Sequence, residues 1–168
     1  DGVYYAQLQQ RALLLISSKP AYAAVTLTDP TAYADFTIAR FAPNDATVAF
    51  KANKKGEYDA FTVPPSFQAP VSILDGTNAQ DLQWLPDSEF LAYWGYATED
   101  MTGPHLFTVR KDGSSFARVS PSGTLVLCGA APCFELMGDA IVFSTLDDAQ
   151  TGNQLFETLG APGAMSVQ

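Results

Sequence analysis

The stretch Phe41–Phe50, FAPNDATVAF, decides the fold, because a second version of it returns as WLPDSEFLAY at Trp84–Tyr93. Each version has an aromatic residue, a polar turn that contains proline, and an apolar segment that ends in alanine and an aromatic residue. Proline presets φ for a turn, and Asn or Asp beside it hydrogen-bonds the local backbone. Each version therefore predicts a hairpin corner between two β-strands, and the recurrence predicts a repeated supersecondary unit.

The composition is that of a globular chain with many short strands. The 168 residues are 47% hydrophobic and include 11 prolines and 12 glycines, which suit tight turns. Acidic residues outnumber Lys and Arg by 18 to 9, a balance that repels nucleic acid and anionic membranes. The longest apolar run, Ala12–Ile16, is too short to span a bilayer. We therefore expect neither a nucleic-acid partner nor membrane insertion.

Around the corners, the chain divides into units of about 40 to 50 residues with four strands each, a period typical of propeller blades. We expect clear units at 35–75 and 80–120 and a weaker one at 133–160, where Gly138–Asp139 replaces the proline turn. Their expected strands are 36–40, 47–51, 58–63, 71–74, 81–84, 89–94, 105–110, 116–120, 140–144 and 153–158. Strands are also expected at 3–8, 11–17 and 22–27, with a helix over 7–16 as the alternative. The predicted fold class is all-β, a β-propeller of four-stranded antiparallel blades in a single domain, 1–168.

The units resemble the TolB-type β-propeller repeat, which is related to WD40-like repeats. The segments that carry the resemblance are Trp84–Asp87, Phe90–Tyr93, Leu106–Val109 and Asp112–Gly113, with Phe41–Asn44, Val48–Phe50 and Ala60–Val63 in the first unit. The glycine that follows the turn aspartate in that family is replaced by Asp45 and Ser88, so we expect less strained turns here. The resemblance implies a mostly extracytoplasmic bacterial setting and a propeller that binds other proteins or accompanies a catalytic domain. It implies no catalytic residue.

About four blades fit in this chain, whereas propellers of that family usually close with six or more. We therefore expect an incomplete sector of a larger propeller or assembly. The start at Asp1–Gly2, which resembles the turn Asp112–Gly113, favours a chain that begins partway through a repeat. A small closed propeller and an open stack of blades that pairs with a partner are the alternatives.

Cys128 and Cys133 flank a turn-like Gly-Ala-Ala-Pro segment, so their Cα atoms can approach bridging distance. We expect a disulfide, which would indicate an oxidising compartment, periplasmic or secreted. Two reduced, half-buried thiols are the alternative. We expect no metal and no cofactor, because a second cysteine pair is absent and the single histidine lies elsewhere.

Catalytic signatures are weak. His105 is the only histidine, and we interpret it as a loop or strand-edge residue rather than a general base. The sequence contains no Gly-x-Ser-x-Gly elbow, phosphate loop or zinc signature. We therefore expect no catalysis within this chain.

A binding rim is the candidate site. Equivalent loops of successive blades emerge on one face, and two of the expected loops carry adjacent acids. An aromatic cluster lies beside the first of these loops. The candidate residues are Trp94, Tyr96, Glu99, Asp100, Asp147 and Asp148. Solvated loop acids and rings packed between blades are the competing interpretation. The corner Phe41–Phe50 itself is expected only to build the blade.

The predicted function is a non-catalytic scaffold that binds another protein, or the remaining blades, as a homo- or hetero-oligomer. One alternative is the propeller portion of a peptidase or of a glycoside-processing enzyme. The other is a structural subunit of a filament or surface layer, in which blade edges pair with the next chain.

Overall fold

A computed structural model provides the fold. It describes residues 4–9, 12–17, 24–26, 28–29, 31–33, 35–44, 47–54, 56–64, 69–74, 79–97, 100–121, 123–128, 132–138, 140–147, 153–159 and 165–166. Side chains are described within these stretches from 26 to 145, apart from 57, 97 and 100–102. The described residues form strands, turns and bends without a helix, and every strand pairing among them is antiparallel. The predicted all-β class is confirmed.

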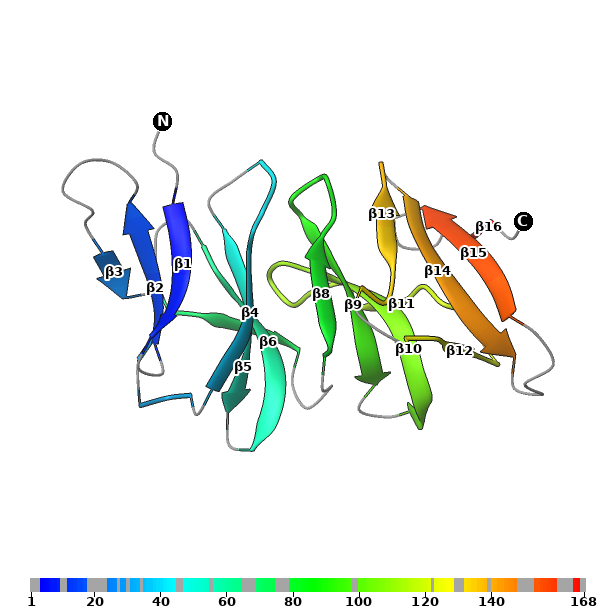
Figure 1. Cartoon of the computed structure of the whole chain (residues 1–168), viewed down its shortest axis with the longest axis horizontal. Coiled ribbons are helices and arrows are strands. Elements are labelled where there is room, and N and C mark those ends of the chain that lie inside the picture. The colour runs from blue at the N-terminus through cyan, green and yellow to red at the C-terminus, as the bar shows by residue number, and fades with distance from the viewer. Residues whose placement is uncertain are drawn as a thin grey trace.

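Four sheets stand side by side in chain order (Figure 1). The first contains β1 (Tyr4–Gln9), β2 (Ala12–Ser17) and β3 (Ala24–Thr26). The second contains β4 (Asp35–Phe41), β5 (Val48–Lys54), β6 (Glu57–Val63) and β7 (Val71–Leu74). The third contains β8 (Asp81–Trp84), β9 (Phe90–Ala97), β10 (Asp100–Arg110) and β11 (Ala117–Arg118). The fourth contains β12 (Thr124–Val126), β13 (Glu135–Met137), β14 (Ala140–Asp147), β15 (Asn153–Leu159) and β16 (Met165–Ser166).

The first and last sheets lie at opposite ends of the row, so the sheets form an open sector of a propeller (Figure 1). In the second and third sheets, strands follow one another in space as they do in sequence. This meander is the arrangement of a propeller blade. The predicted architecture of four-stranded antiparallel blades in an incomplete propeller is confirmed.

The core consists of layers between neighbouring sheets. Along β5, Phe50 belongs to a cluster on one face of the second sheet, while Ala49 belongs to the cluster shared with the third sheet. Along β9, Tyr93 packs toward the second sheet and Ala92 toward the fourth. Successive side chains of a strand point to opposite faces, so a strand between two sheets is largely apolar on both faces. This explains the uninterrupted Val-Ala-Phe and Leu-Ala-Tyr segments.

The repeated corners are confirmed as the hairpins that lead from β4 to β5 and from β8 to β9. In the second corner, Asp87 Oδ1 accepts hydrogen bonds from the backbone N–H groups of Glu89 and Phe90, at 2.9 and 3.1 Å. The two corners also touch: Asn44 N–H donates to Ser88 Oγ at 2.8 Å, and Asn44 Nδ2 donates to the Pro86 carbonyl at 2.7 Å. The turn residues therefore close each hairpin and also join neighbouring sheets.

The expectation of a less strained turn at Ser88 was wrong. Ser88 has a φ of +59°, in the left-handed region where a side chain is unfavourable, and the residue is 3% exposed. Its hydroxyl is the acceptor for Asn44, a contact that glycine cannot make. The serine thus adopts the backbone conformation expected of glycine and adds a link to the preceding sheet.

The expected position of His105 was also wrong. The third sheet's central hairpin is longer than predicted, because β9 continues to Ala97 and β10 begins at Asp100. His105 lies opposite Gly95 inside this hairpin and is 2% exposed. A register shift between Asp100 and His105 accommodates the Gly103–Pro104 segment within the strand.

The helical alternative at residues 7–16 was wrong as well. β1 and β2 form a hairpin in which Gln9 lies opposite Ala12 and Tyr4 opposite Ser17. Pairing with β2 and β3 supplies partners for the backbone, and this tertiary context outweighs the modest helix propensity of Gln, Arg, Ala and Leu.

Candidate binding groove

A groove of about 580 Å³ follows the first strands of the second, third and fourth sheets. One side of the groove is formed by β4 and its corner, and the middle is formed by β8. The other side is formed by β13 and by Pro132, the residue before the second cysteine. The lining residues are Arg40, Phe41, Pro43, Asp81, Gln83, Trp84, Pro132 and Glu135. Three sheets thus contribute to one site, which we call the groove.

Aromatic rings and prolines form the apolar part of the groove. Trp84 is 5% exposed, and its indole Nε1 donates to the Arg40 carbonyl at 3.0 Å, across the boundary between β8 and β4. Phe41 is half-buried beside it, and Pro43 is exposed. The indole is fixed at its polar edge and packed in the core, so it is rigid, and only a small part of it is open to the groove.

Charges of both signs lie along the groove. The Arg40 side chain is exposed and donates one hydrogen bond to the Ala39 carbonyl at 3.2 Å. Glu135 on β13 is also exposed, whereas Asp81 on β8 is half-buried. The groove therefore offers a cation on the β4 side and carboxylates on the β8 and β13 sides, the pattern of a polar rim around apolar contacts.

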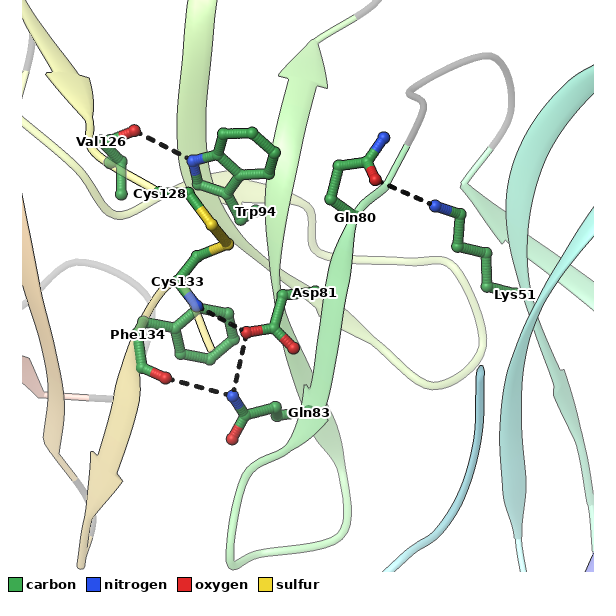
Figure 2. Close-up of a disulfide and its surroundings, with 9 residues drawn as sticks. All are labelled: Lys51, Gln80, Asp81, Gln83, Trp94, Val126, Cys128, Cys133 and Phe134. Atoms are coloured by element: carbon green, nitrogen blue, oxygen red, sulfur yellow. Dashed lines mark hydrogen bonds between the residues drawn. A yellow bond between two sulfur atoms is a disulfide. The ribbon is translucent and has the colours of Figure 1, made fainter. Parts of the chain in front are cut away.

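Asp81 is held by the fourth sheet. Its Oδ2 accepts a hydrogen bond from the Cys133 backbone N–H at 2.9 Å and one from Gln83 Nε2 at 3.3 Å (Figure 2). Gln83 Nε2 also donates to the Phe134 carbonyl at 3.2 Å. The polar side chains of β8 are thus positioned by backbone groups next to a cysteine, and the second carboxylate oxygen of Asp81 has no hydrogen bond in the described structure.

The expected disulfide is confirmed. Cys128 and Cys133 are bonded, with their Cα atoms 4.7 Å apart (Figure 2). Cys133 is 7% exposed and belongs to the core between the third and fourth sheets, while Cys128 is half-buried against the same core. Cys133 follows directly in sequence on Pro132, which lines the groove.

Lys51 connects the second and third sheets near the start of β8. It is 5% exposed, its Nζ donates to Gln80 Oε1 at 3.4 Å, and it lies 4.7 Å from the centre of the Tyr58 ring. Desolvation lowers the pKa of the Lys51 ammonium group. The lysine does not line the groove, and we interpret its role as structural.

Of the six residues expected at a binding rim, the structure describes the side chains of Trp94 and Tyr96. Trp94 is half-buried on β9, and its Nε1 donates to the Val126 carbonyl of β12 at 3.0 Å. Tyr96 is half-buried further along β9. The loops are shorter than expected, because Asp100 is the first residue of β10 and Asp147 the last of β14; their side chains are outside the described set. Glu99 and Asp148 lie outside the described residues. A shared rim of these six residues stays a prediction.

Sequence reasoning missed the groove. Phe41, Pro43 and Trp84 line the groove although they belong to the repeated corners. The expectation that the corner Phe41–Phe50 only builds the blade stays a prediction. The aromatic position before each proline was the available signal, since both copies bring one such ring to the groove. No local sequence pattern marks the other polar lining residues as a site, because their proximity depends on how three sheets stack. These residues are Arg40, Asp81, Gln83 and Glu135.

The described residues contain neither a metal-binding cluster nor a membrane-spanning helix. Within this part of the chain, no three His, Cys, Asp or Glu side chains come close enough to hold a metal ion. A search of the same residues found no helix with the length and hydropathy needed to cross a membrane.

Comparison with known proteins identifies the fold. No protein-family model matches the sequence, and no curated protein matches it. A protein assigned as TolB in Agrobacterium tumefaciens superimposes with a TM-score of 0.63 at 13% identity, over 99% of this chain and 59% of that one. The fold is that of a TolB-like β-propeller.

Two further structures share this TolB-like fold. TolB of Acinetobacter baumannii matches with a TM-score of 0.55 at 12% identity, over 99% of this chain and 40% of its own. The acylaminoacyl peptidase of Pyrococcus horikoshii matches with a TM-score of 0.54 at 12% identity, over 99% of this chain and 30% of its own. This chain therefore spans about three-fifths of the length of the Agrobacterium protein and less of the other two. At such identities the likeness shows the fold alone.

Proposed function

We propose that this chain is a non-catalytic scaffold, one domain over residues 1–168, which binds an extended segment of another protein in the groove. The observation that carries the proposal is that three successive sheets line one groove with a rigid indole, two prolines and charges of both signs. An extended peptide suits such a site, because its alternate side chains can reach the apolar surface and the charged sides. The groove is also large enough for several side chains, since pockets of this size enclose drug-sized ligands.

The chemistry of the groove favours binding over catalysis. Its lining contains one arginine and two carboxylates, but no Ser, Thr, Cys, Lys or His. His105, the only histidine of the sequence, is buried in β10 and does not line the groove. The lining therefore lacks the hydroxyl, thiol, amine and imidazole groups that most nucleophilic sites use, and its two carboxylates, Asp81 and Glu135, remain as the groups that could act as acid, base or nucleophile. The TolB-like fold and the disulfide together support a setting outside the cytoplasm.

A second candidate function is the propeller portion of a larger enzyme. The specific observation in its favour is the match to the acylaminoacyl peptidase, of which this chain covers 30%. In that case the groove would guide a peptide toward residues outside this chain. Peptide hydrolysis by a longer polypeptide that contains these residues, but not by this chain alone, would favour this candidate.

The proposal is tested with an array of extended peptides of varied charge. We expect a subset to bind, and Arg40→Glu and Glu135→Arg to weaken binding of that subset by about tenfold each, because each reverses an exposed charge in the groove. Both side chains are exposed, so the fold should be retained.

Phe116→Ala is the matched control. This ring is 48% exposed and does not line the groove, so its loss should leave peptide affinity unchanged. Equal affinity of the wild type and both charge-reversal variants, or complete failure of the array to bind, would refute the proposed function.

A further inference from the structure

The first strand of the fourth sheet is interrupted, and the disulfide lies at the interruption. β14 is continuous, but it pairs with β12 at one end and with β13 at the other. Val126 lies opposite Thr145, and Glu135 lies opposite Val142. On β14 only Phe143 and Ser144 separate these two pairings, whereas the eight positions 127–134 separate them on the other side, so the ladder is interrupted there. We call the stretch 127–134 the detour; its described residues are 127–128 and 132–134.

The cysteines close the neck of this detour. The last regular hydrogen bond before it runs from Leu127 N–H to the Ser144 carbonyl at 2.9 Å, and Cys128 is the next residue. Cys133 lies at the return, 4.7 Å away between Cα atoms, and β13 begins two residues later. The covalent bond thus sets the separation of the two ends of an interrupted strand.

The returning end of the detour holds the groove. Cys133 N–H donates to Asp81, the Phe134 carbonyl accepts from Gln83, and Pro132 lines the groove directly. Figure 2 shows the two hydrogen bonds beside the sulfur atoms. Two of the three lining residues that β8 contributes are therefore positioned by backbone groups adjacent to Cys133.

We infer that the Cys128–Cys133 disulfide is a positioning element of the groove, and that its redox state sets the affinity of the groove for its ligand. The effect on affinity rests on the proposed function, because it assumes that the groove binds a ligand. The positioning of the groove residues by the disulfide does not depend on that function. With the bond intact, Cys133 N–H is fixed against the Asp81 carboxylate. With the bond reduced, the detour is free to widen, and Asp81, Gln83 and Pro132 lose their common support.

A dithiol reduces this bond in two exchange steps. A thiolate of the dithiol attacks Sγ of Cys128, the more exposed cysteine, which forms a mixed disulfide and releases Cys133 as a thiolate. The second thiol of the reagent then displaces Cys128. The products are two protein thiols and the oxidised dithiol, so that two electrons pass from the reagent to the protein.

The structural part is tested by amide hydrogen exchange with and without dithiothreitol. We expect faster exchange in the segment 127–134 after reduction and unchanged exchange in the β5–β6 hairpin, which lies in another sheet. The double variant Cys128→Ser/Cys133→Ser should exchange like the reduced protein and should not respond to dithiothreitol. If the exchange rate in 127–134 is unchanged after complete reduction, verified by mass, the inference is overturned, independently of the peptide-binding result.

The functional part uses the peptides that depend on Glu135. Their affinity should fall by about threefold to tenfold on reduction, because a carboxylate loses a positioned hydrogen-bond donor. The Asp81→Asn variant should bind these peptides more weakly than the wild type in both redox states. Its peptide affinity should also change less on addition of dithiothreitol. Faster exchange with unchanged affinity for these peptides would refute the link between the disulfide and the groove. If no peptide binds in any state, the proposed function fails, while the exchange result still decides the positioning role.

Discussion

Replacing Trp84 with Phe should destabilise the fold and identify what the corner tryptophan contributes. Phenylalanine keeps an aromatic ring in the core but removes the Nε1 donor, which leaves the Arg40 carbonyl without its partner at 3.0 Å. We expect a loss of about 1 to 2 kcal/mol from the hydrogen bond, with about 1 kcal/mol more from the smaller apolar ring. The total of about 2 to 3 kcal/mol corresponds to a fall in Tm of roughly 5 to 10 °C for a chain of this size.

The assay is urea unfolding followed by far-ultraviolet circular dichroism at 25 °C, with unchanged m-values as a condition for comparison. Trp94→Phe is the matched control, because it removes the same type of hydrogen bond, also 3.0 Å long, from a ring that is only half-buried. Trp94→Phe should therefore cost less than Trp84→Phe. The reasoning is refuted if the two variants are equally stable, or if Trp84→Phe loses less than about 1 kcal/mol.

Three further substitutions test the packing and the electrostatics of the sheets. Phe61→Ala should cost about 3 to 5 kcal/mol, measured by urea unfolding, because this ring is 2% exposed in an aromatic cluster; a loss below about 1 kcal/mol would contradict that packing. Gly113→Ala should destabilise more than Gly56→Ala in the same assay: both glycines have positive φ, but only at Gly113 would the new Cβ lie 3.3 Å from the Ser72 carbonyl oxygen. Lys51→Met should stabilise the protein at pH 7. The pKa of Lys51 in the folded protein lies below its ordinary value of 10.5, because burial disfavours the charged ammonium group. At every pH below the folded pKa this charge lowers the free energy of unfolding by its full amount, and the loss shrinks as the pH rises from the folded pKa to 10.5. The advantage of Lys51→Met should therefore shrink between neutral pH and 10.5, and a constant advantage would contradict the desolvation effect.

The sequence alone determined the blades, because their signals are local. Proline and Asp or Asn in the corners set the hairpins, and continuous apolar segments such as Val48–Phe50 marked strands covered on both faces. The cysteine spacing was sufficient to predict the bridge between Cys128 and Cys133, since the two residues are close along the chain.

Only the tertiary structure decided the groove. Trp84 finds its acceptor 44 residues away in the preceding sheet, and Asp81 finds the Cys133 amide 52 residues away in the following one. The long hairpin that contains His105 has a register shift, and the left-handed Ser88 has a hydrogen-bond partner in a neighbouring corner. Such pairings arise from how whole sheets stack, and no pattern within a single strand encodes which backbone group of another sheet a side chain will meet.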